Sequence, residues 1–286
     1  RVRLTDNVSM YIDGFKPYMD SATGRKIDIR VIDLLTHSSG LPPYAPVADI
    51  VEKSGAPNPK ALMDWIANCK RDFKPTTKFQ YSCLNFVTLQ NILQNITGMK
   101  LMDYSKKNVF DVLGMKNTMY NPTGETLKLV APTEKQKDGS VILGKVHDPI
   151  ARILNDGNSG NAGVFSNAED LSILAAAMMN GGEYNGRRVL GKLTVDVMTT
   201  VPESVKDLGR SLGWDNYSSY ASNNGNLLHP TKTFSHTGYT GTSIVIDPVS
   251  KTAVILLSHR VHPADVGSVV RLRALVANAV AGSIVK

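Results

Sequence analysis

Residues 242–258 read Thr-Ser-Ile-Val-Ile-Asp-Pro-Val-Ser-Lys-Thr-Ala-Val-Ile-Leu-Leu-Ser. Two runs rich in β-branched and aliphatic residues, Thr242–Asp247 and Ala253–Ser258, flank a short segment that begins at Asp247. β-branched residues favour strands, and an Asp-Pro pair between two such runs favours a turn. The pattern therefore predicts an antiparallel hairpin.

A third strand and a terminal helix extend this hairpin. Lys232–His236 is another short strand-like run, and Pro263 and Asp265 mark the start of a predicted C-terminal helix. A helix that follows an antiparallel hairpin covers one face of the sheet, so we expect an α+β fold with an antiparallel sheet flanked by helices. The apolar stripe of this helix comprises Val269, Leu272, Leu275, Val276 and Ala279.

The earlier part of the chain is predicted to be mostly helical. Lys60–Lys70 and Asn85–Thr97 carry apolar residues at helical spacing, and the second run stops before Gly98. Leu101–Leu113 is expected to form another helix. A further helix is expected after Ser166, where Ser-Asn-Ala-Glu has the form of a capping box.

The domain organisation is predicted from the change between helical and strand-like sequence patterns. We expect one domain with a helical subdomain at about 28–200 and a sheet-and-helix subdomain at about 1–27 and 201–286. Between Tyr120 and Phe165 the pattern is loop-like, with Gly157–Gly163 as its most flexible part. Loops of this length in compact domains are usually functional or disordered, and we expect this one to line a cleft.

The composition limits which classes of protein the chain can belong to. With 286 residues and 42% hydrophobic content, the chain is long enough for a large core, and 20% charged residues argue against a disordered chain. The net charge is +7, but Lys and Arg are scattered without a block of like charge. We therefore expect a solvated surface and no nucleic-acid partner. A peripheral attraction to anionic cell-wall polymer or to lipid headgroups remains open.

Cysteine and histidine usage predicts neither disulfides nor a metal. Cys69 and Cys83 have no disulfide or metal spacing, and we interpret them as buried thiols. His147-Asp148 and His259-x-x-His262 could suggest a metal, but two His at i, i+3 without a carboxylate partner motif are a poor zinc signature, so we expect no metal and no cofactor. No apolar run approaches the ~20 residues of a bilayer span. The chain begins with Arg1 rather than Met, so the lack of an export signal excludes nothing.

Two triplets carry the candidate chemistry, Tyr81-Ser82-Cys83 and His236-Thr237-Gly238. Acyl transfer through a serine needs a nucleophile, a base that takes its proton, and donors for the developing oxyanion. Tyr81 would serve as the base if nearby cations lowered a phenol pKa of about 10. A strand edge with the backbone N–H of Tyr239 would supply donors. The plainer interpretations are an aromatic residue packed in the core and a glycine turn in a strand.

The nucleophile of such a site is missing. Penicillin-recognising serine enzymes carry Ser-x-x-Lys, then a middle box, then Lys-Thr-Gly in chain order. No Ser-x-x-Lys precedes Tyr81. We therefore expect the attacking serine to lie outside the 286 residues.

Several blocks resemble those of class C β-lactamase-related serine hydrolases. That family includes class C β-lactamases, D-alanyl-D-alanine carboxypeptidases and esterases, and the resemblance extends from about Leu4 to the final helix. Phe234–Ser243 resembles the His-Thr-Gly variant of its Lys-Thr-Gly box, and Tyr81–Phe86 resembles its Tyr-Ser-Asn/Asp block. The other matching blocks are Ile29–Pro42, Val146–Asp148, Gly160–Ser166 and Ala168–Leu171.

The resemblance implies a β-lactamase/transpeptidase-like fold and a role for each matching position. Tyr81 would be the general base or proton shuttle, and the N–H of Tyr239 would form half of the oxyanion hole. The other half would come from the nucleophilic serine, which the family places just before Arg1. The implied substrate-binding residues are Cys83, His236, Thr237 and Gly238.

Two departures from the family pattern bear on the substrate. Cys83 stands where Asn or Asp is usual, and a thiol is a weak hydrogen-bond donor. His236 replaces Lys, so a fixed positive charge gives way to a group that is mostly neutral at pH 7. Both changes should weaken recognition of a β-lactam. We therefore expect a peptidase or an esterase rather than an efficient β-lactamase.

Other residues offer alternative chemistry. Ser283–Lys286 is a formal Ser-x-x-Lys, but it follows the His-Thr-Gly box and is interpreted as a helix tail. Ser159-Gly160-Asn161 matches a Ser-x-Asn middle box and competes with the Tyr81 block. Cys83 could act as a replacement nucleophile, although a packed thiol is favoured. His37 is interpreted as a hydrogen-bonded histidine at a helix end.

We expect the full-length protein to form an acyl-enzyme on cell-wall-type D-amino-acid peptides or small esters, in the periplasm or cell envelope. The 286-residue chain alone is expected to be inert. The open alternative is a catalytically inactive relative that binds cell-wall peptide fragments. A Ser-x-x-Lys encoded upstream of Arg1 would favour the enzyme, and a start codon there without such a box would favour the binding protein.

Overall fold

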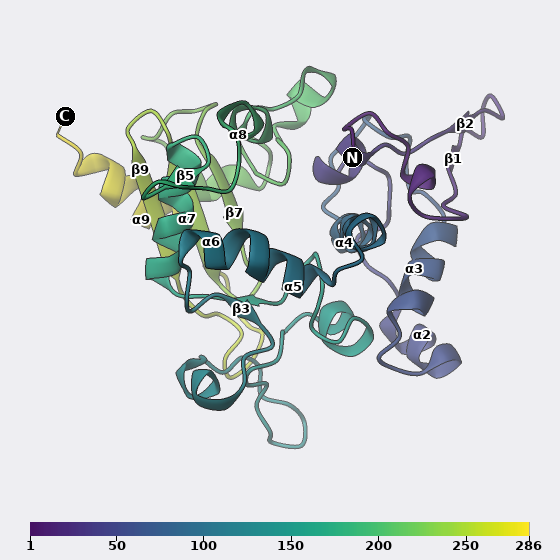
Figure 1. Ribbon diagram of the computed structural model, residues 1–286, viewed down its shortest axis with the longest axis horizontal. Helices are drawn as coiled ribbons and strands as arrows, with labels where there is room; N and C mark the ends of the chain where they lie inside the picture. Colours follow the sequence, from purple (N-terminus) through teal and green to yellow (C-terminus); the bar gives the residue numbers. More distant parts are fainter. Residues whose placement is uncertain (286) are drawn as a thin grey trace. The chain divides into compact units, whose positions relative to one another are not determined.

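The computed structural model describes residues 1–285 and divides them into two compact units (Figure 1). Unit 1 combines Arg1–Ser105 with Lys145–Gly163. Unit 2 combines Lys106–Gly144 with the chain from Val164 onward. Each unit is therefore built from two separate segments of the chain.

This division differs from the predicted subdomain boundaries of about 28–200 and of 1–27 with 201–286. The N-terminal residues belong to unit 1, because the Val8 N–H donates to the Ile29 carbonyl and the Lys16 N–H donates to the Ala67 carbonyl, both at 2.9 Å. Residues 164–200 belong to unit 2, where helix α7 (Ala168–Met179) contacts strands of the sheet. Helical periodicity shows which face of a helix is apolar but not which element covers that face.

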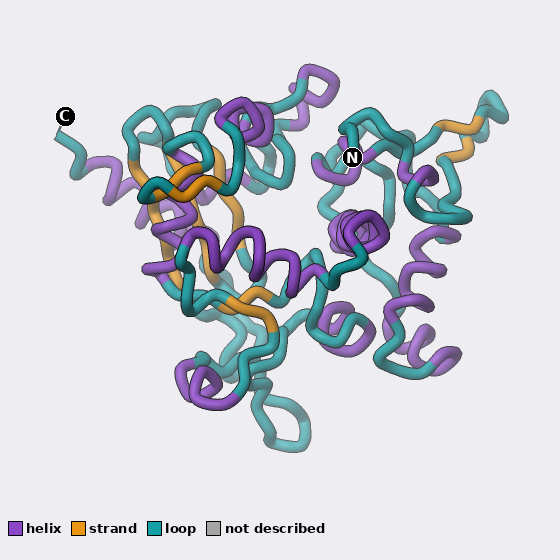
Figure 2. Tube along the Cα trace, in the orientation of Figure 1, coloured by secondary structure: helices purple, strands orange, loops and turns teal. Residues whose placement is uncertain are grey.

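Unit 1 is mostly helical (Figure 2). Its two short strands pair antiparallel, with Tyr18 opposite Ile27. Its elements are a 3-10 turn (Val8–Met10), β1 (Tyr18–Met19), β2 (Lys26–Ile27), α1 (Val31–Leu35), α2 (Val47–Ser54), α3 (Pro59–Asn68), α4 (Cys83–Thr97), α5 (Leu101–Ser105) and a π-helical turn (Ile150–Leu154).

Helix α4 lies in the hydrophobic core of unit 1. It contacts α1, α3 and α5. The Ser82 hydroxyl accepts the Leu84 N–H at 3.2 Å, so the helix begins two residues before the predicted Asn85. It ends at Gly98, which is left-handed with φ +69°, as predicted for a residue that follows a helix. The buried core residues of α3 and α4 are Leu62, Met63, Ile66, Ala67, Leu84, Val87 and Ile92.

A buried polar turn follows α1. Its residues Thr36 to Ser39 are each at most 1% exposed. Gly40 has φ +77°, and a Cβ at this position would lie 2.2 Å from the Phe73 carbonyl oxygen. The Asp72 N–H also donates to the Gly40 carbonyl at 2.7 Å. The turn is therefore packed against residues 72–73 so closely that a side chain at position 40 has no room.

Replacing Gly40 with Ala is expected to destabilise the protein strongly. A left-handed residue with a Cβ costs roughly 1–2 kcal/mol, and overpacking against backbone adds about 1–3 kcal/mol. Gly98→Ala is the matched control, because Gly98 is left-handed with φ +69° and has no atom within 4 Å of its Cβ position, so this variant should lose only the first contribution. Urea unfolding measures both losses. Equal losses in the two variants would contradict the close packing against Phe73.

Unit 2 contains the main sheet and the remaining helices. The helix predicted at Leu101–Leu113 is interrupted, because a π-helical turn (Lys106–Phe110) separates α5 from α6 (Asp111–Leu113). Its other helical elements are α7, α8 (Lys192–Thr199), α9 (Val270–Gly282) and 3-10 turns at Gly124–Leu129, Glu203–Leu208 and Ala221–Asn224. Its strands are β3 (Met119–Tyr120), β4 (Val164–Phe165), β5 (Glu183–Tyr184), β6 (Arg187–Arg188), β7 (Phe234–Thr237), β8 (Thr242–Asp247) and β9 (Thr252–Leu257).

Strands β7, β8 and β9 form an antiparallel sheet in chain order (Figure 1). Phe234 and Ile246 share one cluster with residues of α7, whereas Val245 and Val254 share another with residues of α9. Successive side chains of a strand point to opposite faces, so α7 and α9 cover opposite faces of the sheet. The structure thus confirms the predicted hairpin and the α+β class with helices that flank an antiparallel sheet.

The C-terminal helix starts later than predicted, at Val270 rather than at Pro263 or Asp265. The Asp265 carboxylate accepts the Tyr239 hydroxyl at 2.6 Å and pairs with Arg260 at 2.9 Å, so this carboxylate is engaged in tertiary contacts away from the helix start. No helix within residues 1–285 combines the length and the apolar content that crossing a membrane requires.

The predicted capping box before α7 is wrong in its detail. Asn167 caps the helix, because its Oδ1 accepts the Asp170 N–H at 2.9 Å. The Ser166 hydroxyl instead lies 2.8 Å from the Thr118 hydroxyl. The N-cap is therefore Asn167, one position later than the predicted Ser166.

Candidate acyl-transfer site

The backbone on both sides of Tyr81 is bonded to the turn that follows α1. The Gln80 N–H donates to the His37 carbonyl at 3.0 Å, and the Cys83 N–H donates to the Pro43 carbonyl at 3.1 Å. Helix α4 begins directly after this segment. Tyr81 therefore lies on a short segment before α4 that is held by hydrogen bonds to its neighbours in unit 1.

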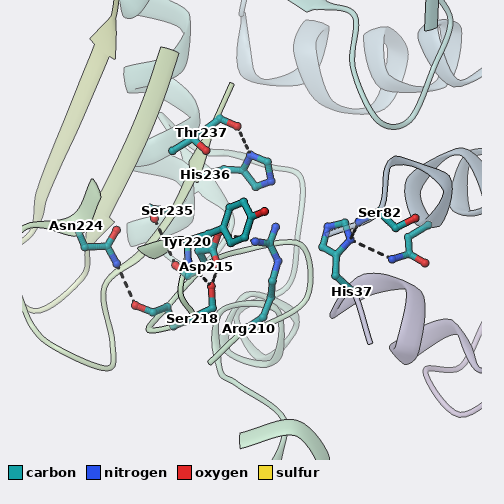
Figure 3. A network of polar contacts seen from close by, with 12 residues as sticks. His37, Ser82, Arg210, Asp215, Ser218, Tyr220, Asn224, Ser235, His236 and Thr237 are labelled. Atoms are coloured by element: carbon teal, nitrogen blue, oxygen red, sulfur yellow. Dashed lines mark hydrogen bonds and ion pairs between the residues drawn. The ribbon is translucent and has the colours of Figure 1, made fainter. Parts of the chain in front are cut away.

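The imidazole of His37 lies against the ring of Tyr81. The two rings are stacked, with centroids 4.3 Å apart and planes at 25°. His37 Nδ1 accepts the Ser82 N–H at 3.1 Å (Figure 3) and lies 3.0 Å from the side-chain nitrogen of Asn85. His37 is 1% exposed, and its hydrogen bonds agree with the prediction of a bonded histidine at a helix end.

The surroundings of Cys83 disfavour a thiolate. Burial raises the pKa of the Cys83 thiol to about 12, and the nearby Asp148 carboxylate contributes to the rise, whereas the Asn161 side chain opposes it. Asp148 itself is held by the Tyr44 hydroxyl and by the Asn161 amide, whose nitrogen lies 3.1 Å from the carboxylate. A thiol with such a pKa is protonated at neutral pH and is a poor nucleophile. The packed-thiol interpretation is therefore favoured over a cysteine nucleophile.

In unit 2, a buried ion pair lies against the strand that carries His236. The Arg210 guanidinium and the Asp215 carboxylate are 2.5 Å apart, with side chains 0% and 6% exposed. Asp215 and Ser235 exchange both backbone hydrogen bonds, at 2.9 and 2.8 Å (Figure 3). Asp215 also accepts the Ser218 hydroxyl. These bonds therefore hold the ion pair against Ser235, the residue before His236.

The His236 imidazole is neutral at pH 7. Burial lowers the pKa of His236 from 6.5 to about 4 together with the Arg210 guanidinium, while the Asp215 carboxylate opposes the shift. Its Nδ1 lies 3.0 Å from the Thr237 carbonyl oxygen. A carbonyl oxygen only accepts, so Nδ1 carries the proton of the neutral ring and Nε2 is its acceptor.

The lowered pKa of His236 predicts how stability depends on pH. As the pH falls below 6.5, the His236 imidazole of the unfolded chain becomes protonated, whereas that of the folded chain becomes protonated only near pH 4. The free energy of unfolding therefore falls as the pH drops through this window. His236→Gln should therefore lose less stability than the wild type between pH 7 and pH 4.5, measured by urea unfolding. Parallel pH profiles for wild type and His236→Gln would contradict the shift.

Two arginines fix the hairpin between β7 and β8. Arg273 Nη2 donates to the carbonyls of Gly238, at 2.7 Å, and Thr242, at 2.9 Å. Arg260 Nε donates to the Tyr239 carbonyl at 2.9 Å, and its guanidinium lies 4.4 Å from the centroid of the Tyr239 ring. The Gly238 carbonyl and the Tyr239 N–H belong to one planar trans peptide and point in opposite directions. The Tyr239 N–H is therefore directed away from Arg273.

The sequence-predicted site residues form two groups in the structure. Tyr81 and Cys83 lie in unit 1, at the start of α4. The other group lies in unit 2, at the end of β7 and in the hairpin that follows: His236, Thr237, Gly238 and Tyr239. Each group is held by hydrogen bonds within its own unit.

The alternative positions are used structurally. The Ser159 hydroxyl donates to Asn161 Oδ1 at 2.6 Å and accepts from Asn155 at 2.8 Å, so it belongs to a buried polar network. Ser283 follows α9 and donates to the Val280 carbonyl at 2.7 Å, while Lys286 lies outside the described residues. Among residues 1–285, no group of three His, Cys, Asp or Glu side chains could hold a metal ion.

Sequence reasoning missed the residues that support the two groups. Arg210 and Asp215 are five positions apart, which resembles a surface ion pair and gives no sign of burial. Arg260 and Arg273 lie outside every motif. Asn85 is the exception, because it stands in the Tyr81–Phe86 block, and its position there is a sequence signal for the hydrogen bond of its amide to His37.

The family model described as Beta-lactamase matches residues 1–278. The chain therefore belongs to the beta-lactamase family, as the resemblance of its sequence blocks predicted.

Curated relatives agree with this assignment. Proteins from Salmonella gallinarum and Salmonella typhi, each named "Putative D-alanyl-D-alanine carboxypeptidase", are 32% identical to this chain over 280 residues. The matched region covers 92% of this chain and 64% of each relative. The chain thus spans less than two thirds of the length of these relatives, so the activity, substrates and partners of the whole protein are matters of proposal.

Solved structures share the fold. EstCE1, described as a hydrolase with promiscuous acyltransferase activity, has a TM-score of 0.69 at 20% identity, over 98% of this chain and 78% of that one. The octameric penicillin-binding protein homologue from Pyrococcus abyssi has a TM-score of 0.65 at 19% identity, over 98% and 60% of the two chains. Similarity at this level of identity shows the β-lactamase/transpeptidase-like fold, as predicted.

Proposed function

We propose that the full-length protein is a serine hydrolase that forms an acyl-enzyme on D-amino-acid peptides or small esters. The match to the family over residues 1–278 carries this proposal, together with the 32% identity to proteins named as carboxypeptidases. The nucleophile of the proposed enzyme is the serine of a Ser-x-x-Lys box encoded before Arg1. The peptide substrate proposed is of the peptidoglycan type.

In the proposed reaction, Tyr81 removes the proton of the attacking serine. The serine oxygen then bonds to the substrate carbonyl carbon, and the negative charge that develops on the carbonyl oxygen is stabilised by the Tyr239 N–H and by the serine's own N–H. The proton returns to the leaving amine or alcohol as its bond to the carbonyl carbon breaks. Water attacks the resulting ester in a second step, which restores the serine hydroxyl.

Specificity in this proposal depends on Cys83 and His236. A neutral imidazole attracts the carboxylate of a β-lactam less than a lysine ammonium would, and a protonated thiol donates a weak hydrogen bond. The lowered pKa of His236 and the raised pKa of Cys83 support both points. We therefore propose peptidase or esterase activity with weak or no β-lactamase activity.

The protein is proposed to act in the cell envelope. Peptidoglycan is an extracytoplasmic polymer with anionic groups, and a net charge of +7 would favour a peripheral association with it or with lipid headgroups. The alternative function is a catalytically inactive relative that holds cell-wall peptide fragments. The replacement of the usual Asn or Asp by Cys83 favours this alternative.

The proposal is tested by comparing the full-length protein with the 286-residue chain. We expect the full-length protein to hydrolyse a 4-nitrophenyl ester or to release D-alanine from a D-Ala-D-Ala peptide. The 286-residue chain should do neither, because no Ser-x-x-Lys precedes Tyr81 within it. Binding of the peptide by full-length protein without turnover of either substrate would support the binding protein instead.

A further inference from the structure

The Tyr81 ring contacts a residue outside the Tyr-Ser-Cys triplet. The imidazole of His37 is stacked face to face on the Tyr81 ring, with centroids 4.3 Å apart and planes at 25°. The same imidazole accepts the N–H of Ser82, the residue that follows Tyr81. One side chain therefore contacts both the ring of Tyr81 and the adjoining backbone.

His37 is itself held in one orientation. Its φ is +52°, in the left-handed region that a residue with a Cβ adopts at a cost of about 1–2 kcal/mol. Such a conformation persists where the surrounding structure determines it, and it is common at functional sites. Nδ1 accepts a backbone N–H, so the neutral ring carries its proton on Nε2.

A hydrogen-bond relay fixes which atoms face His37. The Ser39 hydroxyl donates to Asn85 Oδ1 at 2.5 Å, and the Leu41 N–H donates to the Ser39 hydroxyl oxygen at 3.1 Å. With its oxygen facing Ser39, the Asn85 amide presents its nitrogen to His37 Nδ1 at 3.0 Å. Nδ1 therefore accepts two donors, which specifies both the tautomer and the plane of the imidazole.

We infer that His37 is a positioning residue for the Tyr81 phenol, aligned in turn by the relay of Ser39 and Asn85. The inference rests on the proposed function, in which Tyr81 moves the proton of the nucleophile. A group that transfers a proton must stay within hydrogen-bond reach of its target, and a misplacement of about 1 Å can reduce the rate by about 10². In this role His37 touches no reacting atom, and it acts through its contacts with the ring of Tyr81 and with the N–H of Ser82.

The test uses kcat and KM of the full-length protein with a 4-nitrophenyl ester. His37→Asn keeps an acceptor near Nδ1 and tolerates the left-handed backbone, but it removes the ring that supports Tyr81. We expect kcat to fall about 10- to 100-fold with KM little changed, by the sensitivity of rates to misplacement. His229→Asn is the control, because the Nδ1 of His229 also accepts backbone N–H groups, from Thr231 at 3.3 Å and Lys232 at 3.1 Å, in unit 2 and outside every block that resembles the family, so kcat should stay near the wild-type value.

A double-mutant cycle separates positioning from a purely structural role. In the Tyr81→Phe background, His37→Asn should lower kcat no further, because the phenol through which His37 acts is gone. An equal decrease in both backgrounds, or no decrease in the single variant, would overturn the inference. If Tyr81→Phe alone keeps wild-type kcat, the proposed role of Tyr81 is wrong as well; if it lowers kcat and His37→Asn does not, only the positioning role is wrong.

Ser39→Ala provides a second route if His37→Asn does not fold. This variant keeps His37 but frees the Asn85 amide to turn its oxygen toward Nδ1. We expect kcat to fall about 3- to 10-fold, again only when Tyr81 is present, since losing one neutral hydrogen bond is worth about 0.5–1.5 kcal/mol. An unchanged kcat in Ser39→Ala would overturn the relay.

Discussion

Tyr81→Phe should lower kcat of the full-length protein by about 10² to 10⁴ without unfolding it, because general acid–base catalysis contributes a factor of this size. The substitution removes only the phenol oxygen. The ring remains, so its stacking on His37 and the hydrogen bonds of Gln80 and Cys83 that hold the segment should persist. Steady-state hydrolysis of a 4-nitrophenyl ester measures the loss, and thermal unfolding verifies the fold.

Tyr18→Phe is the matched control for this prediction. Tyr18 lies in the two-residue strand β1 of the same unit, outside every block that resembles the family. The same loss of one hydroxyl group there should leave kcat at the wild-type value. A Tyr81→Phe variant that is fully active would contradict the role of its phenol as the proton shuttle.

Asp215→Asn should destabilise the protein by about 3–5 kcal/mol, the typical effect of removing one partner of a buried ion pair. Arg210 is 0% exposed, and its guanidinium would lose the carboxylate that lies 2.5 Å away. The cation, no longer paired with Asp215, would also oppose protonation of His236 more strongly. Urea unfolding at pH 7 measures the change in stability.

The control for Asp215→Asn is an exposed ion pair of the same unit. Lys192 and Asp196 are 2.7 Å apart, with side chains 74% and 50% exposed. Because solvent screens such pairs, Asp196→Asn should change stability by about 0–1 kcal/mol. Similar small losses for both variants would show that the Arg210 charge is not isolated from water.

The sheet and most helices could be predicted from sequence because local patterns specify them. The β-branched runs on both sides of Asp247-Pro248 are a local signal, and β8 has the same bounds as the first run, Thr242–Asp247. The start of α9 could not be predicted in this way. Asp265 has the chemistry of a helix cap, but it bonds to Arg260 and Tyr239, and those contacts exist only in the folded chain.

The same distinction applies to the candidate site. Tyr81 and His236 stand in short motifs, so the sequence indicated them, and their catalytic and binding roles stay predictions. The arginines that support the β7–β8 hairpin and His236 come from segments without a motif, namely Arg273 at the Gly238 carbonyl and Arg210 beside His236. Burial gives these arginines their influence, and burial of a charged residue has no local sequence signal.

The measurement that tests the central claim most directly is the intact mass of full-length protein quenched during turnover of a slow ester or a β-lactam. The proposed acyl-enzyme predicts a mass increase equal to one acyl group, and peptide mapping should place it on the serine of a Ser-x-x-Lys encoded before Arg1. The 286-residue chain should show no increase under the same conditions. An adduct on Cys83, or turnover without an adduct on any serine, would contradict the claim that this protein acts by serine acyl transfer.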